Sequence, residues 1–325
     1  MTSIEYFIQA FSSLHVDKSK GVAPHKPILL LSIIHEYEVK RILDNRIFIT
    51  PELIHTFSEI WNQLVITEHD KRFALPFYHL RGEKGSWWNL IPKPNCEIWL
   101  ENAGSMRSFA NLNVAIEYAE IDLNLVQLLK NNDGRKVLRE VLINTYFPHS
   151  KVTNIDYKDD NYIANLKNEI LEETPVEYKK LIENLKKNLD KETYQVEIFS
   201  RNVAFRREIL HLYKEKCCIS GLHVSAKFTI TMVDTCHIVP FAESFNNNPT
   251  NGVALSPNLH RAFDRGLLSI DENYRVILSK YFTENLESPY SFNQFNSSQI
   301  TLPSLEKFFP SQEYFAWHRK NKFQK

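Results

Sequence analysis

The sequence predicts an α+β protein with two domains and a helical segment between them. Its 325 residues exceed what one compact core usually spans, and a content of 43% hydrophobic residues is enough for two cores. Residues 151–195 carry 8 basic and 10 acidic side chains, as is typical of a charged helical linker. We therefore expect a mixed helical and β-hairpin domain over 1–150, a linker, helical or partly disordered, over 151–195, and a domain with a β-β-α unit over 196–325.

The first domain is expected to open with a helix over residues 6–14 and to continue with a second helix near Pro27. Proline suits the first turn of a helix, and the residues after Pro27 are almost all apolar. The free amides of such a helix start, together with His25 and the neighbouring Lys26, suit a phosphate group. A buried helix explains the same pattern without a ligand.

Residues 74–81 and 87–92 are predicted to pair as a β-hairpin. Alternation would place Phe77, His79 and Arg81 on one face, where they could contact nucleic acid. Helices are expected over 122–130 and 134–144. The domain then closes with a segment that includes Tyr146 and Pro148, which could form an apolar nook or simply pack in the core.

The second domain is predicted to contain a strand, a loop and a helix whose polar side chains could form one site. Residues 229–233 are rich in β-branched types and predict a strand that delivers His237 at its end. Residues 246–252 are turn formers, and 255–263 predict a helix capped by Ser256 or Asn258 and ended by Gly266. His260 and Asp264 are four residues apart, so they share one helix face and can hold one ion.

This pattern resembles the HNH endonuclease family over about residues 206–279, with His237, Asn251 and His260 at the three positions that name the family. The resemblance implies that His237 is the general base on water and that Asn251 orients the loop around it. It also implies that His260 and Asp264 bind a divalent metal, Mg²⁺ or Mn²⁺ or else Co²⁺, Ni²⁺ or Zn²⁺. The basic residues expected to contact DNA in this segment are Arg261 and Arg265.

The sequence leaves the third metal ligand open. Many family members place a ligand directly before the first histidine, where this chain has Cys236, and Asp234 lies three residues before it. Asp234 is taken as the third candidate ligand. A thiolate at Cys236 would suit Zn²⁺ or another soft ion better than Mg²⁺.

The cysteines and the hydropathy indicate a cytoplasmic protein. Four cysteines are too few for a disulfide framework, and neither a secretory nor a membrane-spanning stretch is evident. Cys217 and Cys218 precede the β-β-α unit, but Ser220 stands where a second zinc-binding cysteine would be needed. They are therefore expected to be buried, reduced thiols.

The first domain resembles the sulfur-binding domain that precedes HNH modules in restriction enzymes specific for phosphorothioate DNA. The residues that carry the resemblance, in chain order over about 5–149, are Pro24, His25, Lys26, Pro27, Phe77, His79, Arg81, Trp87, Tyr146 and Pro148. It implies an apolar pocket for the backbone sulfur, with Tyr146 and Pro148 as candidate walls and His79 and Arg81 as partners for charge or a guanine edge. It also implies a role in antiphage defence.

Charge explains why a recognition domain is needed. Basic and acidic residues number 16 and 17 in residues 1–150 and 15 and 12 in residues 196–325, so counterion release alone cannot hold the protein on DNA. The expected function is therefore that of a modification-dependent restriction endonuclease that binds double-stranded DNA.

Three questions stay open. The nuclease could read a methylated or hydroxymethylated base or a plain sequence, or the chain could be a non-cleaving DNA-binding regulator with a degenerate metal site. Double-strand cleavage would need either a homodimer, formed through the linker or residues 299–325, or successive nicks.

Overall fold

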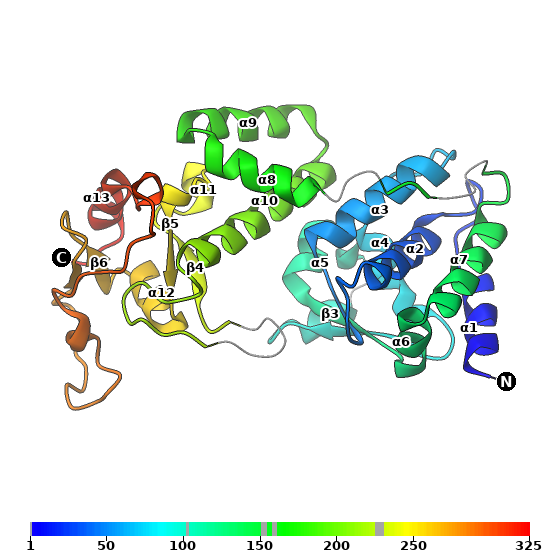
Figure 1. Ribbon diagram of the computed structural model, residues 1–325, viewed down its shortest axis with the longest axis horizontal. Helices are drawn as coiled ribbons and strands as arrows, with labels where there is room; N and C mark the ends of the chain where they lie inside the picture. Colours follow the sequence, from blue (N-terminus) through cyan, green and yellow to red (C-terminus); the bar gives the residue numbers. More distant parts are fainter. Residues whose placement is uncertain (1, 102–103, 151–154, 158–160, 225–230) are drawn as a thin grey trace. The chain divides into compact units, whose positions relative to one another are not determined.

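The computed structural model describes residues 2–101, 104–150, 155–157, 161–224 and 231–325. The chain forms two compact units. Unit 1 comprises residues 1–163 and 190–197, and unit 2 comprises residues 164–189 and 198–325. Three helices occupy the segment expected to be a linker and its junction with unit 2: α8 (Tyr162–Glu172), α9 (Pro175–Asn188) and α10 (Lys191–Leu212) (Figure 1). Most of this segment therefore belongs to unit 2, and residues 190–197 return to unit 1.

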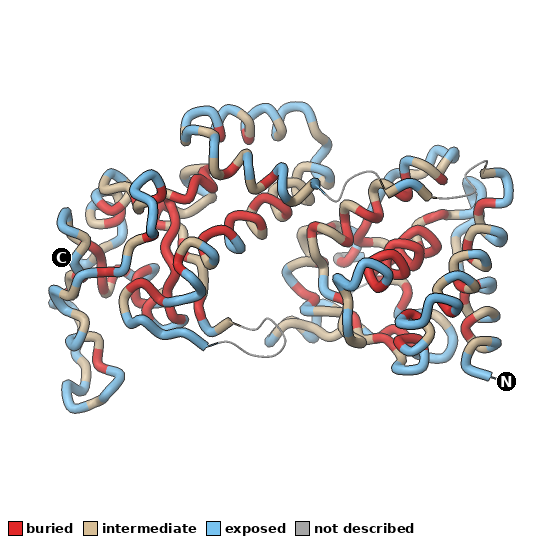
Figure 2. Tube along the Cα trace, in the orientation of Figure 1, coloured by how far each residue is buried: buried red, intermediate tan, exposed pale blue. Residues whose placement is uncertain are grey.

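A buried helix forms the centre of unit 1. Every residue of α2 (His25–Glu38) from Lys26 to Tyr37 is buried, as expected from the apolar run after Pro27 (Figure 2). The buried carboxylate of Glu36 on α2 accepts hydrogen bonds from Thr56 Oγ1 at 2.7 Å and Arg41 Nη1 at 3.0 Å. The other helices of unit 1 are α1 (Ser3–Ser12), α3 (Pro51–Leu64), α4 (Ala74–His79), α5 (Phe109–Ala115), α6 (Leu123–Lys130) and α7 (Asn132–Tyr146).

Unit 1 also holds a three-stranded antiparallel sheet in the order β1-β3-β2. Its strands are β1 (Arg46–Phe48), β2 (Trp88–Pro92) and β3 (Ile116–Ile121). Ala119 on the central strand pairs with Ile47 on one side and with Leu90 on the other. Ile47 and Ala119 are both fully buried, so one face of the sheet packs against the helices.

The predicted β-hairpin over 74–81 and 87–92 is wrong in its first half. Residues Ala74–His79 form α4, and β2 pairs with β3. Ala74, Phe77 and Tyr78 follow helical spacing and are all buried, and Pro76 falls in the first turn, where its missing N–H costs no hydrogen bond. Phe77 therefore lies in the core and not on a face open to nucleic acid.

Unit 2 is built on helices that support two small antiparallel hairpins. The elements are α8, α9, α10, β4 (Asp234–His237), α11 (Phe241–Ser244), β5 (Gly252–Leu255), α12 (Pro257–Asp264), β6 (Leu268–Ile270), β7 (Val276–Leu278) and α13 (Gln312–Asn321). β4 pairs with β5, and β6 pairs with β7. The expected strand over 229–233 lies partly outside the described residues, and the observed strand begins at Asp234. Cys217 and Cys218 are buried free thiols, as predicted.

The described helices are too short or too polar to cross a membrane.

Candidate active site

The β4, β5 and α12 elements form the predicted β-β-α unit. β4 and β5 pair from Asp234 opposite Leu255 to His237 opposite Gly252. Ser256 stands at the N-cap of α12, Pro257 occupies the first helical position, and Gly266 follows the helix end with φ +69°. The unit therefore delivers His237 at a strand end, and it carries His260 and Asp264 one helical turn apart.

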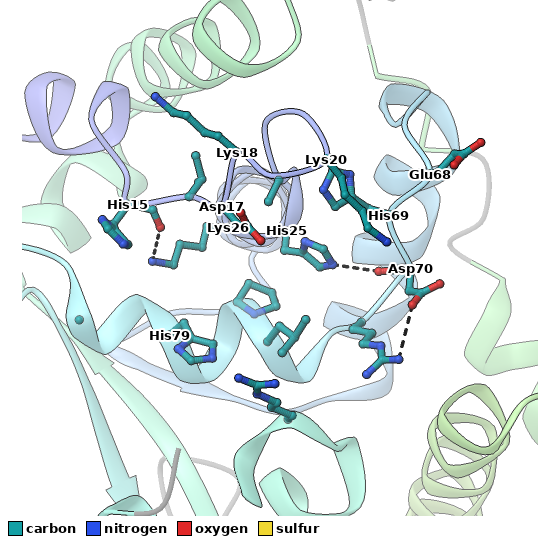
Figure 3. A pocket seen from close by; sticks show the side chains of 17 residues that line it. His15, Asp17, Lys18, Lys20, His25, Lys26, Glu68, His69, Asp70 and His79 are labelled. Atoms are coloured by element: carbon teal, nitrogen blue, oxygen red, sulfur yellow. Dashed lines mark hydrogen bonds and ion pairs between the residues drawn. The ribbon is translucent and has the colours of Figure 1, made fainter. Parts of the chain in front are cut away.

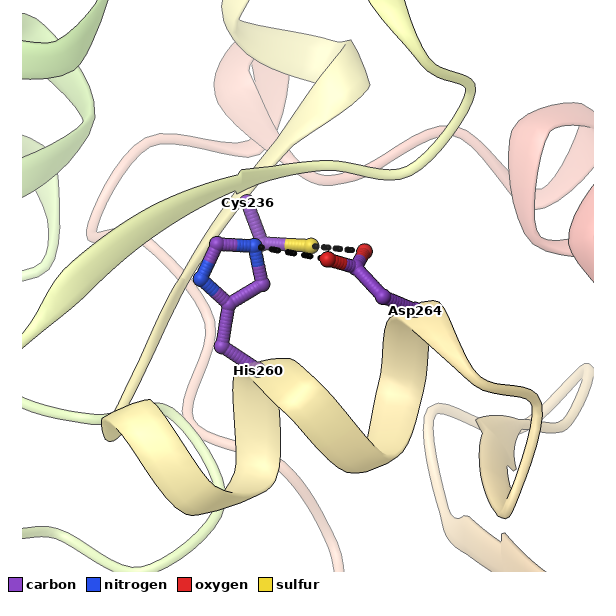
Figure 4. Close-up of side chains that lie close together, drawn as sticks. All are labelled: Cys236, His260 and Asp264. Carbon is purple, nitrogen blue, oxygen red and sulfur yellow. Dashed lines mark hydrogen bonds and ion pairs between the residues drawn. The ribbon is translucent and has the colours of Figure 1, made fainter. Parts of the chain in front are cut away.

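Three side chains converge where β4 crosses α12. Cys236, His260 and Asp264 each place a ligand atom within 4.8 Å of the others (Figure 4). Nε2 of His260 lies 3.5 Å from Oδ2 of Asp264, and Sγ of Cys236 lies 3.9 Å from Oδ1 of the same carboxylate. Imidazole, carboxylate and thiol are all donors that divalent metals accept. The residues present therefore fit a metal ion.

Asp234 lies beside this cluster and contacts the other nitrogen of the His260 ring. Its Oδ2 is 3.5 Å from Nδ1 of His260, while Arg206 approaches its second oxygen at 3.9 Å. Histidines that bind metals usually direct their second nitrogen at a carboxylate, which fixes the ring. The geometry favours Asp234 in that supporting position and Cys236 as the third donor.

Cys236 is protonated in this environment without a metal. Burial, followed by the neighbouring carboxylate of Asp264, raises the pKa of the Cys236 thiol well above its ordinary value. A metal ion at this position would have to displace that proton, so metal binding at Cys236 would weaken in acid.

His237 is held in a fixed plane next to the cluster. Its ring stacks on Phe205 with centroids 4.2 Å apart, and its Nε2 hydrogen-bonds Oδ1 of Asn247 at 2.8 Å. Burial lowers the pKa of His237, an effect that the Asn247 contact partly opposes. A neutral imidazole is the form that can accept a proton.

His237, His260 and Asp264 line one pocket of about 410 Å³, together with Lys322. The candidate base, two of the three candidate ligands and a cation thus face a common space.

Asn251 holds the loop that follows His237. Its side chain is fully buried, its Oδ1 accepts from the amide of Val239 at 2.9 Å, and its Nδ2 donates to the carbonyls of Val239 and Asn246 at 3.0 and 3.1 Å. Three backbone groups of the loop therefore depend on one amide.

A histidine outside the motif supports α12 from α13. His318 stacks on Phe263 with centroids 3.7 Å apart, and its two ring nitrogens hydrogen-bond the Phe263 carbonyl at 3.0 Å and Ser269 Oγ at 2.8 Å. Phe263 directly precedes Asp264, so this buried contact fixes the helix end that carries the carboxylate.

Unit 1 contains a pocket of about 1110 Å³ (Figure 3). Five Lys and Arg and three Asp and Glu residues line it, so its charge is net positive. The basic and imidazole groups are His15, Lys18, Lys20, His25, Lys26, His69, Arg72, His79 and Arg107, and the apolar ones are Val16, Ala23, Leu75 and Pro76. We call this the unit 1 pocket.

The unit 1 pocket gathers three of the residues expected to bind DNA: His25, Lys26 and His79. Nε2 of His25 contacts the carbonyl of Asp70 at 2.9 Å. Lys26 is buried, donates to the carbonyl of His15 at 2.8 Å and forms an ion pair with Glu83. Burial lowers the pKa of both His25 and His79. Their imidazoles are therefore neutral hydrogen-bonding groups near pH 7.

The other expected DNA contacts lie elsewhere. The core of unit 1 buries Pro27, Phe77 and Trp87, so the expectation that these three residues contact DNA is wrong. They pack in the core instead, and the Trp87 ring lies against Phe11 with centroids 5.6 Å apart. Arg81 is exposed, with its guanidinium 4.3 Å from the centre of the Tyr78 ring. The hydroxyl of Tyr146 accepts from the amide of Leu14 at 2.9 Å, and Pro148, Arg261 and Arg265 are exposed.

Several residues of these sites had no local signal in the sequence. Asn247 lies within a run of turn formers that predicts a loop and no particular contact. The cations Lys18 and Lys20, Arg72, and Arg107 come from three separate segments, and only the tertiary fold brings these segments together.

The comparison with protein families agrees with the site in the β-β-α unit. Residues 217–271 match the model of the HNH endonuclease family. No curated protein matches the chain. Among solved structures, one similar chain is the "Modification dependent TagI restriction endonuclease", at 17% sequence identity and a TM-score of 0.28, with 36% of this chain and 36% of that chain covered. The family match and the β-β-α geometry together identify residues 217–271 as an HNH endonuclease domain.

Proposed function

We propose that the protein is a modification-dependent restriction endonuclease that binds phosphorothioate-modified DNA through the unit 1 pocket and cleaves DNA near the mark with its HNH domain. The observation that carries the recognition step is the lining of the unit 1 pocket, in which neutral imidazoles and apolar groups are surrounded by lysines and arginines. The sequence resemblance to sulfur-binding domains points the same way.

The lining suits a sulfur-substituted phosphate for a physical reason. Sulfur in place of a non-bridging oxygen leaves the charge unchanged but makes that atom larger and less strongly hydrated. An oxygen loses strong hydration when it enters an apolar environment, whereas sulfur loses less. Leu75 and Pro76 supply apolar surface, His79 supplies a neutral hydrogen-bonding group, and Lys20 and Arg107 supply positive charge for the phosphodiester.

The HNH domain supplies the groups for hydrolysis. His237 would take a proton from the attacking water, and Asn251 keeps the loop around it in place. Cys236, His260 and Asp264 would hold a divalent metal ion, which neutralises charge on the phosphate and the leaving oxygen when bound. The native metal would be selected by this donor set.

A competition binding experiment tests the recognition step. Phosphorothioate and ordinary duplexes of one sequence compete for the full-length protein without divalent metal, so that cleavage does not interfere. We expect the phosphorothioate duplex to bind more tightly, and equal affinity would refute the sulfur assignment. Adding duplexes with methylated or hydroxymethylated bases distinguishes the other marks.

Variants then locate the binding site. His79→Ala should reduce the preference for the phosphorothioate duplex, whereas His149→Ala, at an exposed position outside the pocket lining, should leave it unchanged. Lys20→Gln should weaken the binding of both duplexes equally and reduce the slope of log K against log salt by about 1.

Nicking assays with Mg²⁺, Mn²⁺, Co²⁺, Ni²⁺ and Zn²⁺ test cleavage. If the protein cuts marked DNA with none of these metals, it is the non-cleaving regulator. Cleavage of both strands by a monomer would remove the need for a homodimer.

A further inference from the structure

One buried amide connects the candidate base to helices that precede the HNH segment. Asn247 is fully buried, and its Nδ2 donates to Oδ1 of Asn202 at 2.9 Å and to the hydroxyl of Tyr178 at 3.2 Å. Its Oδ1 is the atom that faces Nε2 of His237, at 2.8 Å. Rotating the amide by half a turn would bring its oxygen against the Asn202 oxygen, so the surrounding acceptors select the observed orientation.

The orientation of this amide determines which nitrogen of His237 carries the proton. An amide oxygen can only accept, so Nε2 of His237 must be the N–H donor of a neutral ring. Nδ1 is then the one ring nitrogen with a lone pair for a proton. The stack on Phe205, at an interplanar angle of 18°, fixes the plane in which that lone pair lies. Tautomer and ring plane are thus set by two separate contacts.

The partners of Asn247 come from outside the segment that matches the HNH family. Tyr178 lies on α9 and Asn202 on α10, whereas the matched segment begins at residue 217. Tyr178 is itself fully buried, and Arg201 lies 5.9 Å from the centre of its ring and forms an ion pair with Glu169 of α8 at 2.7 Å. The helical pair α8–α9 therefore contributes to the support of the active site.

We propose that Asn247 is a positioning residue that selects the Nε2-protonated tautomer of His237, and that Tyr178 and Asn202 fix the orientation of Asn247. The tautomer itself follows from these contacts alone. Its catalytic consequence rests on the proposed function, in which His237 is the base. A histidine in the wrong tautomer presents N–H to the water and cannot accept its proton.

The tautomer is read directly by ¹⁵N NMR of the full-length protein labelled at histidine, with the His237 signals identified by their loss in His237→Gln. The native protein should show protonated Nε2 and unprotonated Nδ1. Asn247→Leu removes the acceptor and should give a mixture of tautomers. A protonated Nδ1 in the native protein, or an unchanged pattern in Asn247→Leu, would overturn the proposal.

Cleavage kinetics give a second readout. Asn247→Leu should lower kcat by about 10- to 100-fold with KM unchanged, as is common when a supporting hydrogen bond of a catalytic group is lost. Asn248→Ala is the matched control, because Asn248 lies next in the loop and donates to the Glu173 carbonyl at 2.9 Å. The Asn248→Ala variant should be less stable than the native protein but should keep the native tautomer of His237 and the native kcat. If Asn247→Leu and Asn248→Ala lose kcat equally, the role of Asn247 is structural only.

Two further variants keep the test decisive. If Asn247→Leu does not fold, Tyr178→Phe removes only the hydroxyl that accepts from Asn247, and it should shift the same tautomer signals to a smaller extent. If the His237 tautomer signals do not shift in Tyr178→Phe, Tyr178 does not fix the orientation of Asn247. His237→Ala tests the base separately: normal cleavage by that variant defeats the catalytic assignment even where NMR shows the expected tautomer.

Discussion

Mild acid is expected to weaken unit 2 through one buried imidazole. His318 has 1% of its surface exposed. Burial lowers the pKa of His318 from 6.5 to about 4, and the nearby Lys322 and Arg319 act in the same direction, while the hydrogen bond to the Phe263 carbonyl acts against it. The folded protein therefore keeps this ring neutral at a pH where the unfolded chain protonates it.

The sign and size of the effect follow from linkage. Because the folded-state pKa is the lower one, the stability contribution is fully present above about pH 6.5 and is lost as the pH falls toward 4. Each pKa unit corresponds to about 1.4 kcal/mol, so the complete loss is about 3 kcal/mol, of which about 2 kcal/mol is lost by pH 5. A change of that size is a large fraction of a typical unfolding free energy.

Hydrogen exchange of amides in α12 and α13 measures this loss locally, without assuming that both units unfold together. The comparison is between the native protein and His318→Gln at pH 7 and at pH 5, so that intrinsic exchange rates cancel at each pH. Glutamine retains hydrogen-bonding groups but does not titrate, so the variant should be less stable at pH 7 and less sensitive to acid. An equal loss of protection in both proteins between the two pH values would refute the reasoning.

Three further predictions concern the HNH domain. Gly252→Ala should destabilise unit 2 by about 1–3 kcal/mol and slow cleavage. The reason is that a Cβ at residue 252 would lie 2.7 Å from Cζ of Phe205, whose ring stacks against His237. A variant with native stability in a denaturant titration would contradict this prediction. His237→Ala should abolish cleavage and leave DNA affinity unchanged in binding assays, and residual cutting at the native rate would disprove its role as the base. Co²⁺ should give a thiolate-to-metal absorption band in the native protein that disappears in Cys236→Ser, whereas a band in both would place the thiolate elsewhere.

The sequence predicted the β-β-α unit of the candidate site because the signals for this unit are local. His260 and Asp264 are placed by helix geometry alone, and β4, β5 and α12 follow one another within a short stretch of chain. The third donor could not be assigned that way. Asp234 and Cys236 are two residues apart on β4 and share one face, so which of them meets the ion depends on where along β4 the helix α12 packs, and that is a tertiary property.

Unit 1 was harder to predict because its sites depend on distant segments. Residues 74–81 contain aromatic residues that are common in strands, but burial on several sides favours the helix α4 there. The central strand β3 is enclosed between partners from before it in the chain, β1 and β2. The cations of the unit 1 pocket likewise come from segments whose sequences give no indication of a shared surface.

The division of the chain into units limits how its parts can be exchanged. Residues 190–197 belong to unit 1 but lie in the chain between two portions of unit 2. A single crossover at residue 195 would take Tyr178 away from Asn247, and one at residue 150 would leave 190–197 without the rest of unit 1. A single recombination event therefore cannot replace either unit as a whole. Under the proposed function, a new specificity would therefore have to arise by substitution within unit 1, or through a graft with two junctions that leaves α9 with the nuclease domain.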